Sequence, residues 1–283
     1  MRGLGLGLRL RPSGGSAGPT PGQQEAAAWA LAAGAGATEV GQEAIEAFMA
    51  LITGTAVEDK LHRVNLLIGS DLTAVRTPLP SFNAGGATDA NTGLLIGDYT
   101  ETGLAGGLKG NATDKYLDTG FASNLLTVDN RMLAVVETVR ATLEYAISIG
   151  SAEGVNTDNW WLGTDEFVNI TRYRQSATYE GADFGPTLGA TAWIGSSVDA
   201  DEVVIYEGQG ASIVQSLGAV TVPLTATTTT VKVLAAGRPA GAASNPSDAR
   251  IGAYVIGEAL NFAEAQILND ALRAAMLVLG RTA

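Results

Sequence analysis

Apolar residues follow their most regular pattern near the end of the sequence. In residues 250–257, RIGAYVIG, they run together as in a buried strand, and from residue 261 they recur at the three- and four-residue spacing of a helix. Asn261 and Glu264 have the spacing of a capping box, and Gly280 is a natural helix stop. The pattern predicts a last strand followed by an amphipathic helix. The expected apolar face of this helix contains Leu268, Leu272, Ala275, Met276 and Leu279.

A second helical pattern occupies residues 38–52. Thr38 is a favourable N-cap, and Gly54 is a favourable residue just after the last turn. A shorter helix is predicted over about residues 57–64. It contains His62, the only histidine of the chain. Because basic residues flank this side chain, we expect it at the surface or in a cap rather than in a catalytic role.

Most of the sequence between the two long helices has the pattern of β-structure. Short apolar segments alternate there with Gly, Asn, Asp and Thr, at a spacing typical of a sandwich or barrel. The strand candidates are NRMLAVVETV, LEYAISIGS, NWWLGT, EFVNITRYR, ATAWIGSS, EVVIYEG, TTTTVKVLAAG and RIGAYVIG. We predict one mainly β domain, an antiparallel sandwich over residues 65–260. N-terminal helices are expected in residues 38–64, and a C-terminal helix packed on the sandwich is expected in residues 261–283.

Residues 1–37 are predicted to form an extended arm that contains much Gly and Pro. Gly alternates with Leu in its first part, and Gly, Ser and Pro follow. Ordering so many glycines is entropically unfavourable, so an ordered arm needs a partner, and it could pair as a strand with the sheet edge of another subunit. The leucines concerned are Leu4, Leu6, Leu8 and Leu10.

Charge divides the chain into a basic arm and an acidic remainder. The net charge is −12, yet the arm carries Arg2, Arg9 and Arg11, and the first acidic residue is Glu25. The rest holds 14 of the 17 basic residues and all 29 acidic residues, a net charge of −15. The arm is either a solvated tail or a basic anchor that docks onto an acidic neighbour, such as another copy of the chain. The acidic balance argues against general nucleic-acid binding, which needs a basic surface.

Composition narrows the class of protein further. Charged residues make up only 16%, and the 36 glycines are about twice the usual share, a composition common in proteins that belong to assemblies. The absence of cysteine excludes disulfides, thiol catalysis and cysteine zinc sites, and it fits a reducing cytoplasm. No apolar run approaches the length of a membrane span, and arginines interrupt any signal-peptide core, so we expect no membrane insertion.

Little in the sequence predicts catalysis. A nucleophilic triad has only one poorly placed histidine to draw on. Paired carboxylates could hydrolyse glycans, but acids beside strand ends commonly serve as turn residues. The candidates are Asp165 with Glu166, and the group Asp199, Asp201 and Glu202, in which Asp199 and Asp201 could share one face of a strand. A calcium loop in residues 156–161 would have one acid, Asp158. We expect no enzyme activity, no cofactor and no bound metal.

Aromatic residues of the β-region are better candidates for binding. Trp160 and Trp161 are adjacent, so on a strand their rings point to opposite faces, and one ring could be exposed for stacking on a sugar. The alternative, which we favour, is that both rings are buried, each in one of two packed layers. The carbohydrate-binding candidates are Trp160, Trp161, Trp193 and Tyr173.

Several motifs occur in the same order as in a known family. They are GLKGNATDKYLDTGF, AWIGSSVDADEVVIYEGQ, the segment 231–281, and the earlier AIEAFMALI and DKLHRVNLLIG. Over about residues 38–281 the chain resembles concanavalin A-like, LamG-like domains of bacteriophage and prophage virion proteins, such as tail-fibre and tail-associated proteins. The resemblance implies a jelly-roll sandwich of two antiparallel sheets with a closing helix, and a multimeric particle component. The sequence lacks the Glu-x-Asp-x-Glu strand of related glucanases and the Asp-rich metal loop of legume lectins, so no site residue is carried over.

The expected function is that of a virion structural protein assembled in the host cytoplasm. The first hypothesis is a tail-fibre or tail-associated, lectin-like adhesin at the particle surface. Its partners would be other virion proteins, copies of itself in a homo-oligomer such as a trimer, and host surface glycans. The residues expected to anchor it are Leu4, Leu6, Leu8, Arg2, Arg9 and Arg11. The alternative is a capsid decoration or cement protein of the same fold that binds no sugar, and glycoside hydrolysis is a minor third hypothesis.

Overall fold

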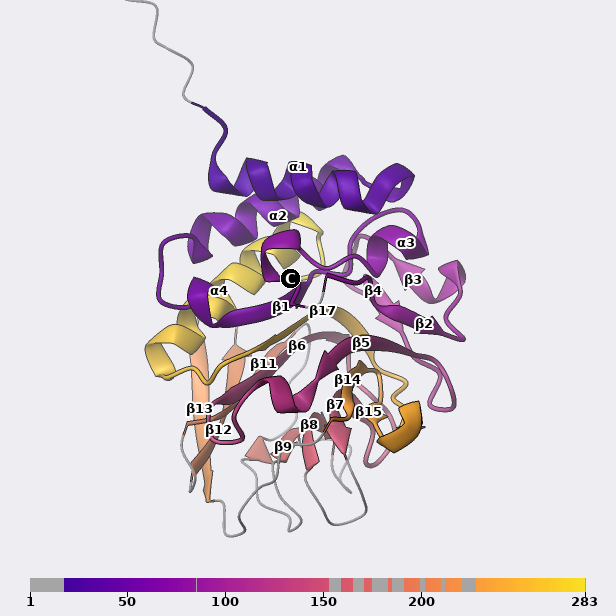
Figure 1. The fold of residues 1–283 in the computed structure, drawn as a ribbon, viewed down its shortest axis with the longest axis vertical. Helices are drawn as coiled ribbons and strands as arrows, with labels where there is room; N and C mark the ends of the chain where they lie inside the picture. Colours follow the sequence, from indigo (N-terminus) through magenta and orange to yellow (C-terminus); the bar gives the residue numbers. More distant parts are fainter. Residues whose placement is uncertain are drawn as a thin grey trace, which may run out of the picture.

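Two stacked β-sheets and a layer of helices build the described part of the chain (Figure 1). The computed structural model describes residues 18–84, 86–152, 159–164, 171–174, 183–184, 191–198, 202–209, 212–219 and 228–282. Helices cover one face of the first sheet, and the second sheet covers its other face. This arrangement confirms the predicted fold class, a mainly β sandwich of the jelly-roll type with a C-terminal helix.

The first sheet has eight strands, and all its pairs are antiparallel. The strand order is β13-β12-β11-β6-β17-β4-β3, and β1 pairs with β17 beside this path. The strands are β1 (Leu61–Asn65), β3 (Tyr99–Thr100), β4 (Gly107–Lys109), β6 (Arg131–Val139), β11 (Thr191–Ser197), β12 (Glu202–Gln209), β13 (Ser212–Ala219) and β17 (Arg250–Gly257).

The second sheet has nine strands in the order β10-β9-β8-β7-β14-β5-β2, with β15 and β16 beside this path. Its pairs are antiparallel except that of β15 with β7, which is parallel. The strands are β2 (Ala90–Thr92), β5 (Tyr116–Ala122), β7 (Ile147–Ala152), β8 (Asn159–Thr164), β9 (Thr171–Arg174), β10 (Asp183–Phe184), β14 (Thr230–Val233), β15 (Ala236–Gly237) and β16 (Ala243–Ser244).

The helical layer is built from both ends of the described chain. Its long members are α1 (Pro21–Ala33), α2 (Glu39–Ile52) and α4 (Phe262–Val278), and α3 (Leu72–Val75) is a single turn. In this layer α1 packs on α2, and α2 packs on α4. Short 3-10 helices occupy Gly34–Gly36, Glu58–Lys60, Pro80–Phe82, Ile96–Asp98, Ser123–Leu125 and Pro239–Gly241.

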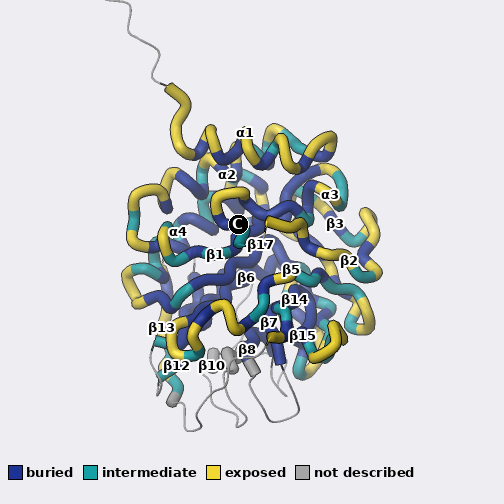
Figure 2. Tube along the Cα trace, viewed as in Figure 1, coloured by how far each residue is buried: buried dark blue, intermediate teal, exposed yellow. Residues whose placement is uncertain are grey.

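The first sheet is the central layer and is buried on both faces. On β6, Met132 and Val136 pack with the helices, whereas Leu133 and Val135 pack against the second sheet. Figure 2 shows this layer as the dark centre of the molecule, with exposed segments at its periphery. Because side chains alternate along a strand, one strand thus supplies two separate hydrophobic cores.

Both long helices predicted from the sequence begin where their caps were expected. Asn261 Oδ1 accepts a hydrogen bond from the Glu264 amide at 3.0 Å, and Glu264 Oε2 accepts one from the Asn261 amide at 2.9 Å. Thr38 Oγ1 caps α2 by accepting from Gly41 N at 3.1 Å. The predicted apolar face of α4, with its five residues, is buried.

Two predictions for the N-terminal part are wrong. The expected helix over residues 57–64 is a 3-10 turn followed by β1, because the edge of β17 offers hydrogen bonds that pair β1 as a strand. His62 lies on this strand, half-buried, with Nε2 3.4 Å from Glu258 Oε1.

Residues 21–33 also do not continue an extended arm. They form α1, which begins with a capping box between Thr20 and Gln23. The alanine-rich sequence favours a helix. Buried Trp29 fixes this helix in place, because its Nε1 donates to Thr77 O at 3.1 Å. Only the first part of the predicted arm precedes this helix.

The end of the chain is tied into the sandwich by Arg281. Its buried guanidinium donates to the carbonyl oxygens of Leu66, Leu67 and Gly252 at 3.1, 2.8 and 2.7 Å. Nε donates to Glu101 O at 2.8 Å. A single cation therefore joins the segment just after α4 to β17 and to two loops.

Candidate functional site

The paired tryptophans of β8 lie on opposite faces of the second sheet, and both are buried. Trp160 packs in the core between the sheets, with the guanidinium carbon of Arg131 4.8 Å from its ring centre. Trp161 is 6% exposed and packs in a small cluster with Ile147 and Ala236. The alternative in which both rings are buried is confirmed, so neither ring has a face open for stacking on a sugar.

The other predicted site residues divide into buried and undescribed ones. Trp193 on β11 is buried between the sheets, and the guanidinium carbon of Arg140 lies 5.2 Å from its ring centre. Tyr173 lies on β9, but its side chain is outside the described part of the structure. The six arm residues expected to anchor the protein, Leu4, Leu6, Leu8, Arg2, Arg9 and Arg11, also lie outside it. The exposed aromatic surface expected of an adhesin is thus not formed by the three tryptophans.

A polar cluster beside Trp193 was not predicted from the sequence. Buried Glu137 on β6 accepts a hydrogen bond from Ser148 Oγ on β7. Burial raises the pKa of Glu137, while this hydrogen bond and the nearby charge of Arg140 act in the opposite direction. Buried Glu207 on β12 adds a second carboxylate whose charge acts on Arg140. Because Glu137 and Ser148 belong to different sheets, the contact joins the two halves of the sandwich.

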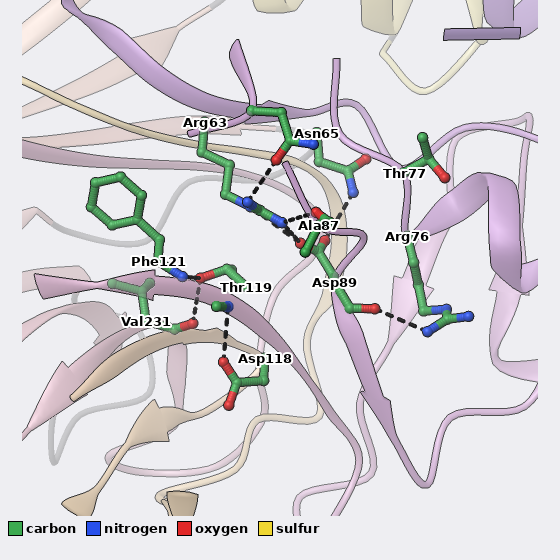
Figure 3. Close-up of polar contacts among 12 residues, drawn as sticks. Arg63, Asn65, Arg76, Thr77, Ala87, Asp89, Asp118, Thr119, Phe121 and Val231 are labelled. Atoms are coloured by element: carbon green, nitrogen blue, oxygen red, sulfur yellow. Dashed lines mark hydrogen bonds and ion pairs between the residues drawn. The ribbon is translucent and has the colours of Figure 1, made fainter. Parts of the chain in front are cut away.

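Figure 3 shows another buried network, around Arg63 of β1. Arg63 Nη2 donates to Asp89 Oδ1 at 2.7 Å, and Asn65 Nδ2 donates to Asp89 Oδ2 at 3.0 Å. The hydroxyl of Tyr254 on β17 donates to the same carboxylate at 2.7 Å. Both members of the ion pair are buried. The carboxylate is fully used inside the protein, so the network holds a loop onto β1 and β17 and offers no open binding site.

A third polar cluster lies on β5 and β14 of the second sheet. Asp118 accepts hydrogen bonds from Lys232 Nζ at 2.5 Å and from Thr230 Oγ1 at 3.0 Å. The Gly120 amide also donates to this carboxylate, at 3.0 Å. Burial raises the pKa of Asp118, but the hydrogen bonds and the charge of Lys232 outweigh it and hold this pKa below its ordinary value. The cluster pins two neighbouring strands together.

The free edge of the first sheet is the strongest candidate for an interaction site. β13 pairs with β12 over eight residues without a register shift, and within the described ranges no other strand pairs with it. Val214 and Leu217 are exposed on it, and Phe262 is exposed at the start of α4. The sequence analysis missed this strand. Only Gly210 and Ala211 separate it from β12, and a two-residue connection that contains Gly is typical of a tight hairpin. This short connection after EVVIYEG is the signal that could have revealed the strand.

Metal and membrane sites are not seen in the part of the chain that the structure describes. No three His, Cys, Asp or Glu side chains gather there into a group that could hold a metal ion. No described helix combines the length and the apolar character needed to cross a bilayer. The acid candidates Asp158, Asp165, Glu166, Asp199 and Asp201 lie outside the described residues.

Comparison with known proteins gives distant structural similarity alone. The chain matches no protein-family model and no curated protein sequence. Domain 4 of AbnA, a GH43 extracellular arabinanase from Geobacillus stearothermophilus solved with arabinotriose, aligns at 14% identity and a TM-score of 0.42, over 75% of this chain and 98% of that domain. The Trypanosoma rangeli sialidase aligns at 14% identity and a TM-score of 0.34, over 63% of this chain and 26% of the sialidase. No function is transferred from similarities this distant.

Proposed function

We propose that the protein is a non-enzymatic structural component of a bacteriophage particle and that it acts by packing against neighbouring subunits, copies of itself among them. The observation that carries this proposal is the free edge of β13 with its exposed apolar residues. The resemblance of the ordered motifs to phage virion domains, the low charge and the basic N-terminal segment support it.

Of the two roles within a particle, we favour that of a decoration or cement protein over that of an adhesin. The adhesin hypothesis expected loops or an aromatic-bearing face to contact host glycans, and the rings of Trp160, Trp161 and Trp193 are buried. A decoration or cement protein needs no such rings. It needs a surface that other subunits can cover, and a sheet edge with exposed apolar side chains supplies one.

Gold-labelled antibody imaging of purified particles tests this proposal. Label over the head would identify a decoration or cement protein, and label at the tail or on fibres would identify a tail-associated component. Antibody first absorbed with the purified protein is the control. Particles that carry no label above this control would refute the proposal, whereas label on fibres together with saturable glycan binding would restore the adhesin role.

A further inference from the structure

Within the described ranges, the edge presented by β13 lacks the charges, prolines and bulges that often protect a sheet edge. Its sequence, SIVQSLGA, contains no charged residue and no proline, and all eight of its residues pair in register with β12. An edge strand directs every second backbone N–H and C=O group away from the sheet, where another strand can pair with them. In the drawn view β13 lies at one margin of the sandwich (Figure 1).

Side chains on both sides of this edge provide apolar contacts. Leu217 is 58% exposed and pairs with Val204 on the face that packs against the helices. Phe262, 48% exposed, extends this face, because its ring contacts Tyr206 two residues further along β12. Val214 is 41% exposed on the opposite face. A strand added here would therefore cover apolar surface as well as satisfy backbone groups.

The charges around this edge are acidic. The two strands of the hairpin contain no Lys or Arg. Their two acidic residues are Glu202, which is partly exposed, and Glu207, which is buried and acts on Arg140. Glu264 in the first turn of α4 acts electrostatically on Tyr206, as Glu202 does. Lys60 also reaches this helix end, but it is paired with Glu264 at 2.7 Å. A basic strand with alternating apolar residues would complement this surface.

We infer that residues 3–10 of a neighbouring copy add to β13 as a further strand of the first sheet, an inference that rests on the proposed assembly function. The segment GLGLGLRL matches β13 in length. As a strand it places four leucines on one face, toward Leu217 and Phe262, and three glycines and Arg9 on the other. Arg9 within the segment and the flanking Arg2 and Arg11 provide the positive charge that the acidic edge lacks.

A neighbouring copy is a better donor than the same chain because of the reach of the linker. Residues 11–17 connect the segment to Gly18, just before α1, and extended they span at most about 25 Å. The path from α1 to the sheet crosses α2 and α4. Packed helices lie about 8–10 Å apart. The three steps from α1 to α2, from α2 to α4 and from α4 to the sheet therefore add up to roughly the full reach of the linker. Pairing within one chain leaves no slack, whereas pairing between chains has no such limit.

Disulfide trapping tests this inference cleanly, because the 283 residues of the chain include no cysteine. Leu6→Cys in one purified chain and Gln215→Cys in another are mixed and oxidised. The exposed Leu31 of α1 supplies the control partner, Leu31→Cys. The expected result is a heterodimer between positions 6 and 215 at several times the yield of the control pair. Equal yields would overturn the inference.

Two further variants separate the donor and the nature of the contact. A chain with both Leu6→Cys and Gln215→Cys should form dimers and larger species, and an internally closed monomer alone would overturn the assignment to a neighbour. Leu217→Lys in the acceptor should reduce trapping several-fold with an unchanged melting curve, whereas Leu31→Lys should not. Since purified protein is used, failed trapping combined with labelled particles would reject this inference but leave the proposed function intact.

Discussion

Replacement of Asp89 by alanine is expected to be among the most destabilising single changes in this protein. Its carboxylate accepts hydrogen bonds from Arg63, Asn65 and Tyr254, and both partners of the ion pair are buried. The substitution leaves the guanidinium of Arg63 buried without its counter-charge. Its remaining bonds go to neutral oxygens, including Asn83 Oδ1 and Ala87 O, each at 2.8 Å.

Removal of one partner of a buried ion pair destabilises a protein by about 3–5 kcal/mol. A chain of this size loses about 2 °C of melting temperature per kcal/mol, so the midpoint should fall by roughly 6–10 °C. Urea unfolding followed by circular dichroism measures the change in the free energy of unfolding directly. The matched control is Asp98→Ala, which breaks a partly exposed pair with Lys115 and should cost no more than about 1 kcal/mol.

The double variant Arg63→Met with Asp89→Leu gives an independent test of the cause. It removes both charges together, so it should be less destabilised than Asp89→Ala alone. The buried charge is not the cause of the instability if Asp89→Ala lowers the free energy of unfolding by less than about 1 kcal/mol. The same conclusion holds if the double variant loses as much free energy of unfolding as its two single substitutions added together.

Three other substitutions test separate parts of the fold. The lowered pKa of Asp118 means that its carboxylate stabilises the fold above the unfolded pKa of about 3.9, and this stabilisation disappears as the pH falls through the folded pKa. Between neutral pH and about pH 3, the free energy of unfolding measured in urea should therefore fall less for Asp118→Asn than for the wild type. Gly150→Ala would place a Cβ 2.3 Å from the Cβ of Trp161, so we expect a melting temperature well below that of the wild type, and an unchanged thermal melt would contradict this packing. Arg281→Met removes the guanidinium donor from the buried carbonyl oxygens of Leu66 and Gly252, while Leu67 O keeps its bond from Tyr99. It should cost at least about 3 kcal/mol in urea unfolding, with an unchanged midpoint as the contrary result.

Local signals account for the parts of the fold that the sequence predicted. Asn261 with Glu264 and Thr38 with Gly41 act over three residues, so the caps of α4 and α2 can be recognised in the sequence itself. The opposite placement of Trp160 and Trp161 likewise follows from the two-residue period of a strand.

Features that depend on distant contacts were not predictable in this way. Arg63 and Asp89 meet through a chain reversal, and Glu137 and Ser148 meet across two sheets. Nothing in the residues near either pair indicates its partner. The same holds for residues 61–65, where the hydrogen bonds available from β17 outweighed a helix-like pattern. The candidate site was missed because SIVQSLGA lacks a clear alternation of apolar and polar residues. Its position at the edge of the sheet also depends on which strands pair with it, and within the described ranges only β12 does.

The double burial of the first sheet has a consequence for how substitutions are tolerated along the chain. On β5, which belongs to the outer sheet, buried residues alternate with more exposed ones, so a saturation mutagenesis profile should rise and fall with every residue. On β6, eight of the nine residues are buried, and neither parity of position faces water. Its profile should be flat and intolerant throughout. Among diverging copies of this fold, β6 should therefore change most slowly, and new surface properties should arise on the outer sheet and at the sheet edges.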